Sequence, residues 1–249
     1  MQINPNHADA YNNLANLRRD QGTFDEATAL YERAIRMKPN FADAHFNLAV
    51  TLLTVGNFAR GWAEYEWRRS TKSFPTPPLN FVQPRWDGQD LRGRTILLHA
   101  EQGFGDTLQF VRYVPEVTAR GGNVILKCQH ELFRLLRTFP GAQRVLVKGE
   151  PLPAFDVHCP LLSLPMMFNT TMETIPAPVP YLKAADDLIE KWRPKVNLPA
   201  GHLRVGLAWA GSPTFKGDRT RSLHLETLAM LGSVEGVTFF SLQKGIAGE

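Results

Sequence analysis

The sequence predicts a helical repeat region followed by an α/β region built on parallel strands. Three observations lead to this fold class. Shifting the first seventy residues by 34 positions places like residues on like residues, which indicates an internal repeat. From residue 94 onward, short apolar runs alternate with helical segments at the spacing of β-α-β units. A second α/β start of the same kind begins at residue 204.

Composition excludes several function classes. The chain has 249 residues, 43% hydrophobic and 21% charged, which is the balance of a folded protein. Its net charge of +4 comes from scattered basic residues, so we expect no nucleic-acid partner. Cys128 and Cys159 are too few for a disulfide framework and lack the spacing of a zinc site. No signal peptide and no apolar run of ~18 residues is present, so we expect a cytoplasmic protein without a membrane span.

Each repeat is expected to form two helices. Gly22 and Gly56 provide the turn within each pair, and Pro39 ends the second helix because it lacks an amide hydrogen. A fixed period of 34 residues with this pattern resembles the tetratricopeptide repeat. The residues at helical spacing are Tyr11, Leu14, Ala15 and Arg18 in the first helix and Ala27, Leu30, Tyr31 and Ala34 in the second.

The last repeat departs from its own pattern at two positions. Gly61 and Arg68 stand where small apolar residues are expected, which indicates that this repeat turns its face to a different partner. Two complete repeats are fewer than the ~3 that such arrays usually need. Residues 1–6 resemble the tail of a preceding repeat. We therefore expect the array to pack onto the next part of the chain, or the sequence to be a piece of a longer protein.

Arrays of this kind usually hold a peptide in a groove lined by the first helix of each repeat. Asparagine amides can bond to a peptide backbone without selecting its side chains. We therefore expect a protein or peptide partner, and the alternative is that these residues are solvated surface. The candidate groove residues are Asn12, Asn13, Asn16 and Asn47.

The remaining chain is predicted from its apolar runs and breakers. We expect repeats at 1–72, a Pro-rich linker at 73–93, a first α/β domain at 94–184, and a bridging helix with an incomplete second domain at 185–249. Strands are expected at 95–99, 124–126, 145–147, 156–158, 204–209 and 237–242. Helices are expected at 106–120, 131–138, 185–195 and 223–231, and Pro115 is expected either to kink the first of these or to start a fresh turn in it.

Candidate chemistry lies first at the turn of residues 101–106, directly after the first predicted strand. Gly103 and Gly105 permit a tight turn, and Asp106 stands where a helix N-cap belongs. Open α/β sheets bind ligands at this edge. The turn lacks the third glycine of a dinucleotide fingerprint and the lysine of a P-loop. Asp106 is therefore either a site residue or a helix cap.

A second candidate turn, residues 211–222, comes after the later strand. Its basic residues precede a helix expected to begin near Ser222, so the turn could hold a diphosphate. The alternative is a solvated basic loop. The histidine spacing predicts no metal site. The candidate anion ligands are Lys216, Arg219, Arg221 and Ser222.

The order of these parts resembles a known family. The segments ILLHAEQGFGDTLQFVRYVP and RVGLAWAGSP…DRTRSLHLETL…VTFFSLQKG, after a repeat array, are similar to bacterial tetratricopeptide-containing glycosyltransferases. These are related to glycosyltransferase family 9, the heptosyltransferases, and share their layout with O-linked N-acetylglucosamine transferases. The resemblance implies GT-B architecture, with two Rossmann-like domains facing across a cleft.

The resemblance also implies roles for residues. Glu101, Gly103, Gly105 and Asp106 match the family's acceptor-domain turn, whose aspartate is the candidate base. Lys216, Arg219, Arg221 and Ser222 fall in the diphosphate-facing loop. The implied reaction is transfer from a nucleotide sugar, bound as substrate, to a hydroxyl acceptor with inversion, and no metal or other cofactor is expected.

Two hypotheses remain for function. The first is a glycosyltransferase with a peptide-binding array, and the second is a non-catalytic interaction module with an α/β scaffold. The family's later nucleoside-holding segments have no counterpart before Glu249. We therefore expect this chain by itself to transfer no sugar, and to bind nucleotide sugars more weakly than about 1 mM.

Overall fold

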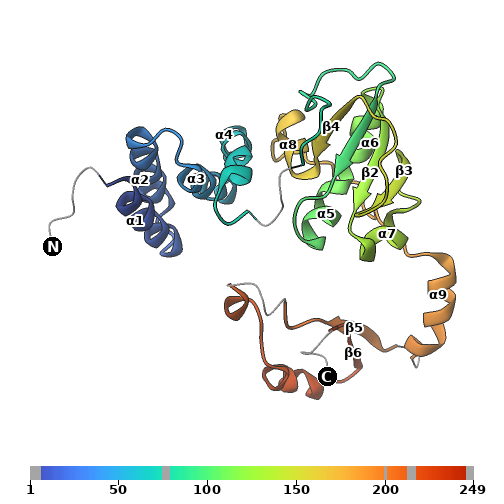
Figure 1. The fold of residues 1–249 in the computed structure, drawn as a ribbon. Coiled ribbons are helices and arrows are strands. Elements are labelled where there is room, and N and C mark those ends of the chain that lie inside the picture. Colours follow the sequence, from blue (N-terminus) through green and yellow to red (C-terminus); the bar gives the residue numbers. More distant parts are fainter. Residues whose placement is uncertain (1–6, 75–78, 199–200, 212–216, 245–249) are drawn as a thin grey trace. The chain divides into compact units, whose positions relative to one another are not determined.

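The computed structural model describes residues 7–74, 79–198, 201–211 and 217–244. It divides into two compact units, Met1–Ala184 and Ala185–Glu249 (Figure 1). The first unit holds the repeat helices and a parallel α/β sheet. The described residues of the second form one short helix, a pair of strands and 3-10 turns. The expected repeat tail at residues 1–6 lies outside the described residues.

The repeat region forms two helical hairpins, as the 34-residue period predicts. Helix α1 packs on α2, α3 packs on α4, and α2 packs on α3. Ala15 and Ala27 are fully buried, so their small side chains let the hairpin helices approach. Gly22 and Gly56 have φ of 79° and 81°, a left-handed conformation that favours glycine. The elements are α1 (Ala8–Asp20), α2 (Phe24–Met37), α3 (Ala42–Thr54), α4 (Phe58–Tyr65) and the 3-10 helix η1 (Glu66–Ser70).

The sheet of the first unit is wholly parallel, with strand order β3-β2-β1-β4. The chain therefore runs outward from β1 to β3 and then crosses back to the other side of β1. In open parallel sheets, the ligand crevice lies where the strand order reverses, at the carboxyl ends of the strands. Here that point is between β1 and β4. The strands are β1 (Thr95–His99), β2 (Asn123–Cys128), β3 (Ala142–Val147) and β4 (Val157–Pro160).

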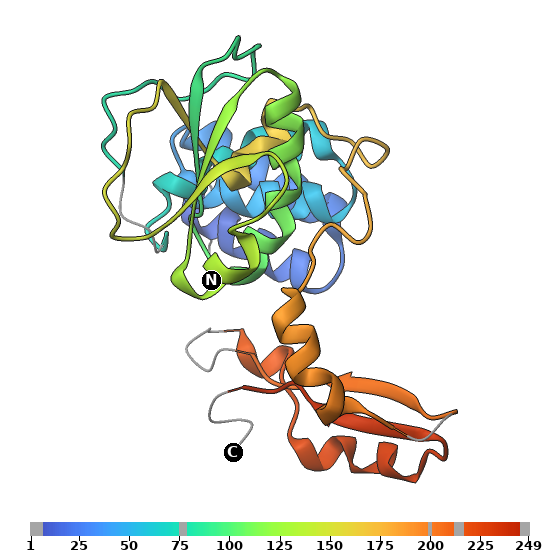
Figure 2. The ribbon, with the colours of Figure 1, turned by 90° about the vertical axis from the view of Figure 1, so that its right-hand side faces the viewer.

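The two faces of this sheet are covered differently (Figure 2). Ile96 and Leu98 face the main core with the helices, whereas Leu97 between them faces a small cluster formed with Phe81 and Phe155 from loops. The crossover from β3 to β4 contains no helix, so loops cover the second face. The covering helices are α5 (Phe104–Phe110), α6 (Val114–Ala119), α7 (His130–Leu136) and α8 (Leu164–Met167).

One helix prediction is corrected here, and the prediction for the Pro-rich segment is refined. The helix expected at 106–120 begins earlier, at Phe104, and is split by the 3-10 turn η2 (Val111–Tyr113). The split falls just before Pro115, which lies in the first turn of α6 and lacks the amide hydrogen that a continuous helix needs. The predicted interruption at this proline is confirmed, because a new helix starts there. The part of the Pro-rich segment from Leu79 onward packs on the sheet, and Trp86 and Leu91 are core residues.

The second unit pairs β5 with β6 in parallel, with Leu203 opposite Val237. The helix expected at 223–231 is instead the 3-10 helix η6, and none of its residues is buried. No described helix in either unit is long and apolar enough to cross a membrane. The elements are α9 (Asp186–Trp192), η4 (Arg193–Val196), β5 (Leu203–Leu207), η5 (Asp218–Thr220), η6 (Leu225–Ser233) and β6 (Val237–Ser241).

Candidate functional site

A polar groove of about 490 Å³ lies along the first helices of the two repeats. Its lining residues come from α1, from α3 and the chain just before it, and from the end of η1 and the chain that follows. Three of the four predicted asparagines line it. The lining residues are Asp9, Asn12, Asn13, Lys38, Asn40, Phe41, Ala42, Asp43, Phe46, Asn47, Ser70, Lys72 and Ser73.

The four asparagines have different environments. The Nδ2 of Asn47 donates to Oδ1 of the buried Asn12 at 3.1 Å, so these two amides orient one another. Asn13 is exposed to the groove. Asn16 does not line the groove, because its Oδ1 accepts a 2.7 Å bond from the hydroxyl of the buried Tyr31. This bond joins the two helices of the first hairpin.

The side chain of Arg68, in η1, lies at the carboxyl ends of β1 and β4, where the strand order reverses. Its guanidinium is 1% exposed and donates from Nη2 to Glu101 at 2.6 Å and to Ser163 at 2.8 Å. Glu101 comes after β1, and Ser163 comes after β4 in the turn η3 (Leu161–Ser163). One cation from the last repeat thus joins the carboxyl ends of both strands. This confirms that the repeat turns its face to another part of the chain at Arg68.

A second carboxylate completes this buried network. Nη1 of Arg68 donates to Glu66 at 3.0 Å, and Glu66 also pairs with Arg85. Burial alone would raise the pKa of Glu66, but the two guanidinium groups outweigh it and hold that pKa below its usual value. Burial would likewise lower the pKa of Arg68, but Glu101 and Glu66 raise it. Each charge therefore depends on its partners.

The turn after β1 holds the predicted base, Asp106. Helix α5 begins at Phe104, so Asp106 is at the third helical position and Gly103 is the N-cap residue. The expectation that Asp106 is the N-cap is therefore wrong. Instead, its Oδ2 accepts a 3.0 Å bond from the backbone amide of Gly103, which is the N3 half of a capping box. Gly105 lies in the first turn of α5 and is exposed.

This arrangement is compatible with both roles considered for Asp106. Its side chain is half-buried, and the bond to Gly103 engages Oδ2, whereas a carboxylate has a second oxygen that can accept a proton. Tyr65 of α4 lies near it. Burial raises the pKa of the Tyr65 hydroxyl, and the negative charges of Asp106 and Glu101 raise it further against the effect of Arg68. The last repeat therefore borders the candidate catalytic turn.

The predicted diphosphate loop is described in part. Lys216 lies outside the described residues, and the description of Arg219 covers its backbone in η5. Ser222 donates to Asp218 at 2.8 Å and accepts from the amide of Gly211 at 2.9 Å, and Arg221 lies 3.4 Å from the same Asp218. These contacts close the loop. Since η6 begins at Leu225, Ser222 does not start the helix, and that expectation is corrected.

No group of three or more histidine, cysteine or acidic side chains is placed to hold a metal ion in the described part of the chain. The sequence had singled out Arg68 and Glu101 separately, but it did not reveal that they pair. The only sign of this contact in the sequence was that Arg68, a charged residue, occupies the position that Ala34 occupies in the preceding repeat. Ser163 carried no signal, because its role depends on where β4 lies beside β1.

We predict that Arg68→Met lowers the free energy of unfolding by about 3–5 kcal/mol, because it removes the 2.6 Å cationic partner of the buried Glu101 and leaves Arg69 at 3.6 Å. Arg18→Met is the matched control. Its ion pair with Glu26 is on the surface, and its loss should cost no more than about 1 kcal/mol. Urea unfolding followed by circular dichroism measures both. Equal losses in the two variants would contradict a critical role for the buried pair.

Comparisons with known proteins agree with the repeat region. A family model described as a TPR repeat matches residues 15–56. Protein FlbA of Caulobacter vibrioides is 28% identical over 269 residues, covering 98% of this chain and 45% of FlbA. The chain thus spans less than half the length of this relative. A mutant O-GlcNAc transferase of Thermobaculum terrenum is 19% identical, with a TM-score of 0.25 over 61% of this chain and 36% of that one. The chain contains a tetratricopeptide repeat and, over nearly its whole length, is similar to FlbA.

Proposed function

We propose that this chain is part of a glycosyltransferase that takes an extended polypeptide in its repeat groove and transfers a sugar to a hydroxyl acceptor with inversion. The observation that supports it best is the short segment after α4. Its Ser70 and Lys72 line the groove, while its Arg68 lies at the carboxyl edge of the sheet beside Glu101. The groove and the candidate turn are therefore adjacent in one unit.

The groove suits a peptide backbone. Asn13 offers an exposed amide, and the Asn47–Asn12 bond fixes a second amide pair beside it. An amide supplies both a donor and an acceptor, which match the carbonyl and amide groups of an extended chain. Lysines and aspartates at the rim would add charge contacts that are screened by salt. We propose that the groove binds an extended segment with little side-chain selection.

The proposed chemistry takes place at Asp106. In the GT-B architecture that the sequence resemblance implies, its carboxylate would accept the proton of the acceptor hydroxyl while that oxygen attacks the anomeric carbon. The bond to the leaving diphosphate would break on the opposite side, which inverts the anomeric centre. Arg221, Arg219 and Lys216 would stabilise the leaving diphosphate, with no divalent metal needed. The nucleotide sugar is substrate and not cofactor.

A specific observation supports the alternative, a non-catalytic interaction module. Asp106 accepts the Gly103 amide bond and Asp218 lies against Arg221, so both predicted turns have structural uses. In that case the groove alone carries the function. Two variant experiments separate the hypotheses, since one affects the groove and the other affects the turn.

We predict that replacing Asn13 and Asn47 together by Ala weakens binding of an extended peptide roughly tenfold or more, through two lost hydrogen bonds of about 1 kcal/mol each. Fluorescence anisotropy with the strongest binder from a peptide array measures it. Asn197→Ala, an exposed asparagine of the second unit, is the control. Unchanged affinity in the double variant would contradict a role in binding and show that these asparagines are solvated surface residues.

We predict that Asp106→Asn lowers kcat by roughly 10²–10⁴, because the amide can still accept the Gly103 bond but cannot act as a base. Release of nucleoside diphosphate from uridine and adenosine diphosphate sugars measures turnover in the protein as its gene encodes it. Asp87→Asn, an exposed carboxylate on a loop, is the control. A variant that loses stability but keeps its turnover would show that Asp106 only starts the helix.

A further inference from the structure

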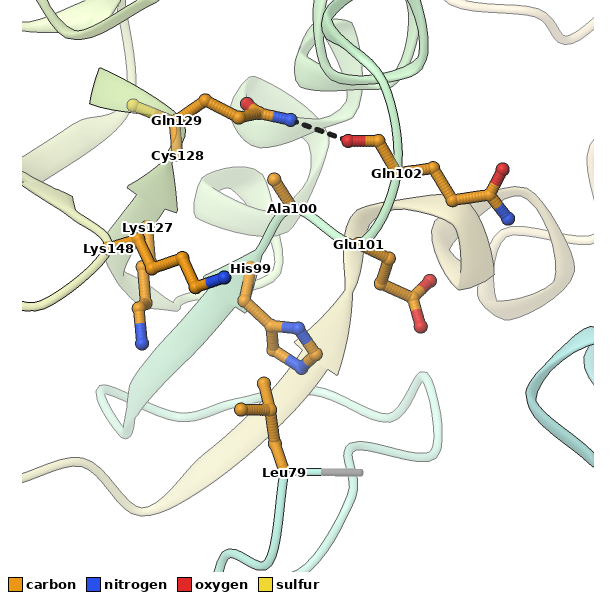
Figure 3. A pocket seen from close by; sticks show the side chains of 9 residues that line it. All are labelled: Leu79, His99, Ala100, Glu101, Gln102, Lys127, Cys128, Gln129 and Lys148. Atoms are coloured by element: carbon orange, nitrogen blue, oxygen red, sulfur yellow. Dashed lines mark hydrogen bonds between the residues drawn. The ribbon is translucent and has the colours of Figure 1, made fainter. Parts of the chain in front are cut away.

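A second cavity lies at the carboxyl edge of the sheet, beside the ends of β1, β2 and β3 (Figure 3). Its volume is about 160 Å³, close to the roughly 150 Å³ of a cavity that takes one benzene ring. The polar and ionisable residues that line it are His99, Glu101, Gln102, Lys127, Cys128, Gln129 and Lys148. None of these except Glu101 has a part in the function proposed above.

The charge around this cavity is positive. Lys127 is half-buried at the end of β2, and Lys148 comes directly after β3. Figure 3 shows both lysines on one side of the cavity and Glu101 on the other, with His99 between them. Glu101 does not balance the lysines, because Arg68 lies 2.6 Å and Arg69 lies 3.6 Å from its carboxylate. The cavity therefore presents two ammonium groups to any molecule that enters it.

His99 adds an unpaired polar atom. The residue is 2% exposed, and its Nε2 lies 3.3 Å from Nδ1 of His158 on β4. Its Nδ1 is buried with no hydrogen-bond partner in the described part of the chain. A buried polar atom without a partner is costly, and a bound molecule can remove that cost.

His99 stays uncharged in this setting. Burial lowers its pKa to about 3, and the positive charges of Arg69, Lys127 and Arg85 act in the same direction, together with His158. The field that disfavours an imidazolium favours an anion at the same place. A metal cation is disfavoured for the same reason.

The geometry points to a binding site for a small organic anion, a carboxylate or phosphate ester no larger than one monosaccharide. Its oxyanion would lie between the ammonium groups of Lys127 and Lys148, and a hydroxyl of its body would bond to Nδ1 of His99. Gln129 holds the wall in place, since its Nε2 donates to the carbonyl of Gln102 at 2.8 Å. That bond joins the site to the Asp106 turn, but the site does not depend on sugar transfer.

Titration of the chain with three probes by calorimetry tests the proposal. The three probes share one sugar ring: glucuronate carries a carboxylate on it, glucose 6-phosphate carries a phosphate, and glucose carries neither group. We expect at least one anion to bind at least about tenfold more tightly than glucose. The stronger anion identifies the preferred group. Equal affinity for all three, or no anion binding at about 10 mM, would overturn the proposal.

Variants locate the binding. Replacing Lys127 and Lys148 together by Met should weaken the preferred anion at least about tenfold, whereas Lys191→Met, which removes an exposed lysine of α9, should leave it unchanged. Equal affinity in the wild type and the double variant would show that the anion binds elsewhere. Circular dichroism checks that each variant folds. If the double variant does not fold, the chemical-shift changes that the anion causes in nuclear magnetic resonance spectra of the wild type locate its site. Changes at residues distant from Lys127 and His99 would contradict the proposal.

The histidine is tested by two amide substitutions. His99→Gln places an amide near the position of Nε2 and keeps the contact with His158, but it removes Nδ1, so binding should weaken several-fold. His99→Asn places an amide near Nδ1 and should retain more of the affinity. Since His99 is neutral, affinity for an ionised carboxylate should be flat between about pH 5 and 8. Identical affinities of the two variants would contradict a role for Nδ1.

Discussion

The docking of the last repeat on the sheet depends on a buried charge network, and its shortest described contact to the sheet joins Arg68 and Glu101. The two partners come from different parts of the architecture, a repeat helix and the end of a β-strand, and their charged atoms are 2.6 Å apart. Burying each charge alone would cost several kcal/mol. Glu66 at 3.0 Å from Arg68 and Arg69 at 3.6 Å from Glu101 complete this network, so each charge is removed from water only when its partners are in place. The last repeat and the sheet must dock in one register for both charges to be satisfied.

A buried ion pair often adds less stability than an apolar pair of the same size, so its presence here calls for another reason. At the equivalent position of the first repeat, Ala34 is fully buried in a cluster with Ala44 of the next helix. An alanine at position 68 would offer the same small surface to a further helix. Arg68 offers a cation instead, and it needs the carboxylate that the strand end provides. We infer that the pair ends the stacking of repeats and selects the sheet as the partner.

The sequence predicted those elements whose cause is local. The 34-residue period placed the helices, because hydrophobic spacing and glycine turns act over short distances. The apolar runs placed β1 to the residue, but they covered only half of β2 and the second half of β3. Prediction from the sequence failed where a contact is long-range. Asn16 was assigned to the groove, but Tyr31 of the neighbouring helix holds its amide. Asp106 was assigned to the N-cap instead of the third helical position, because a glycine N-cap leaves no side-chain signal.

In the candidate sites, too, the sequence predicted what depends on local pattern and not what depends on long-range contacts. Glu101 and Asp106 come directly after β1 in sequence, so the strand pattern alone brought them to the carboxyl edge. Lys127 reaches that edge, and His158 comes beside His99, only because β2 and β4 pair in parallel on either side of β1. A parallel sheet collects the ends of strands that are far apart in the chain, and the repeat array adds Arg68 to them from the amino-terminal side. The chemistry of this edge is thus set by topology, and its composition becomes visible only once the strand order is known.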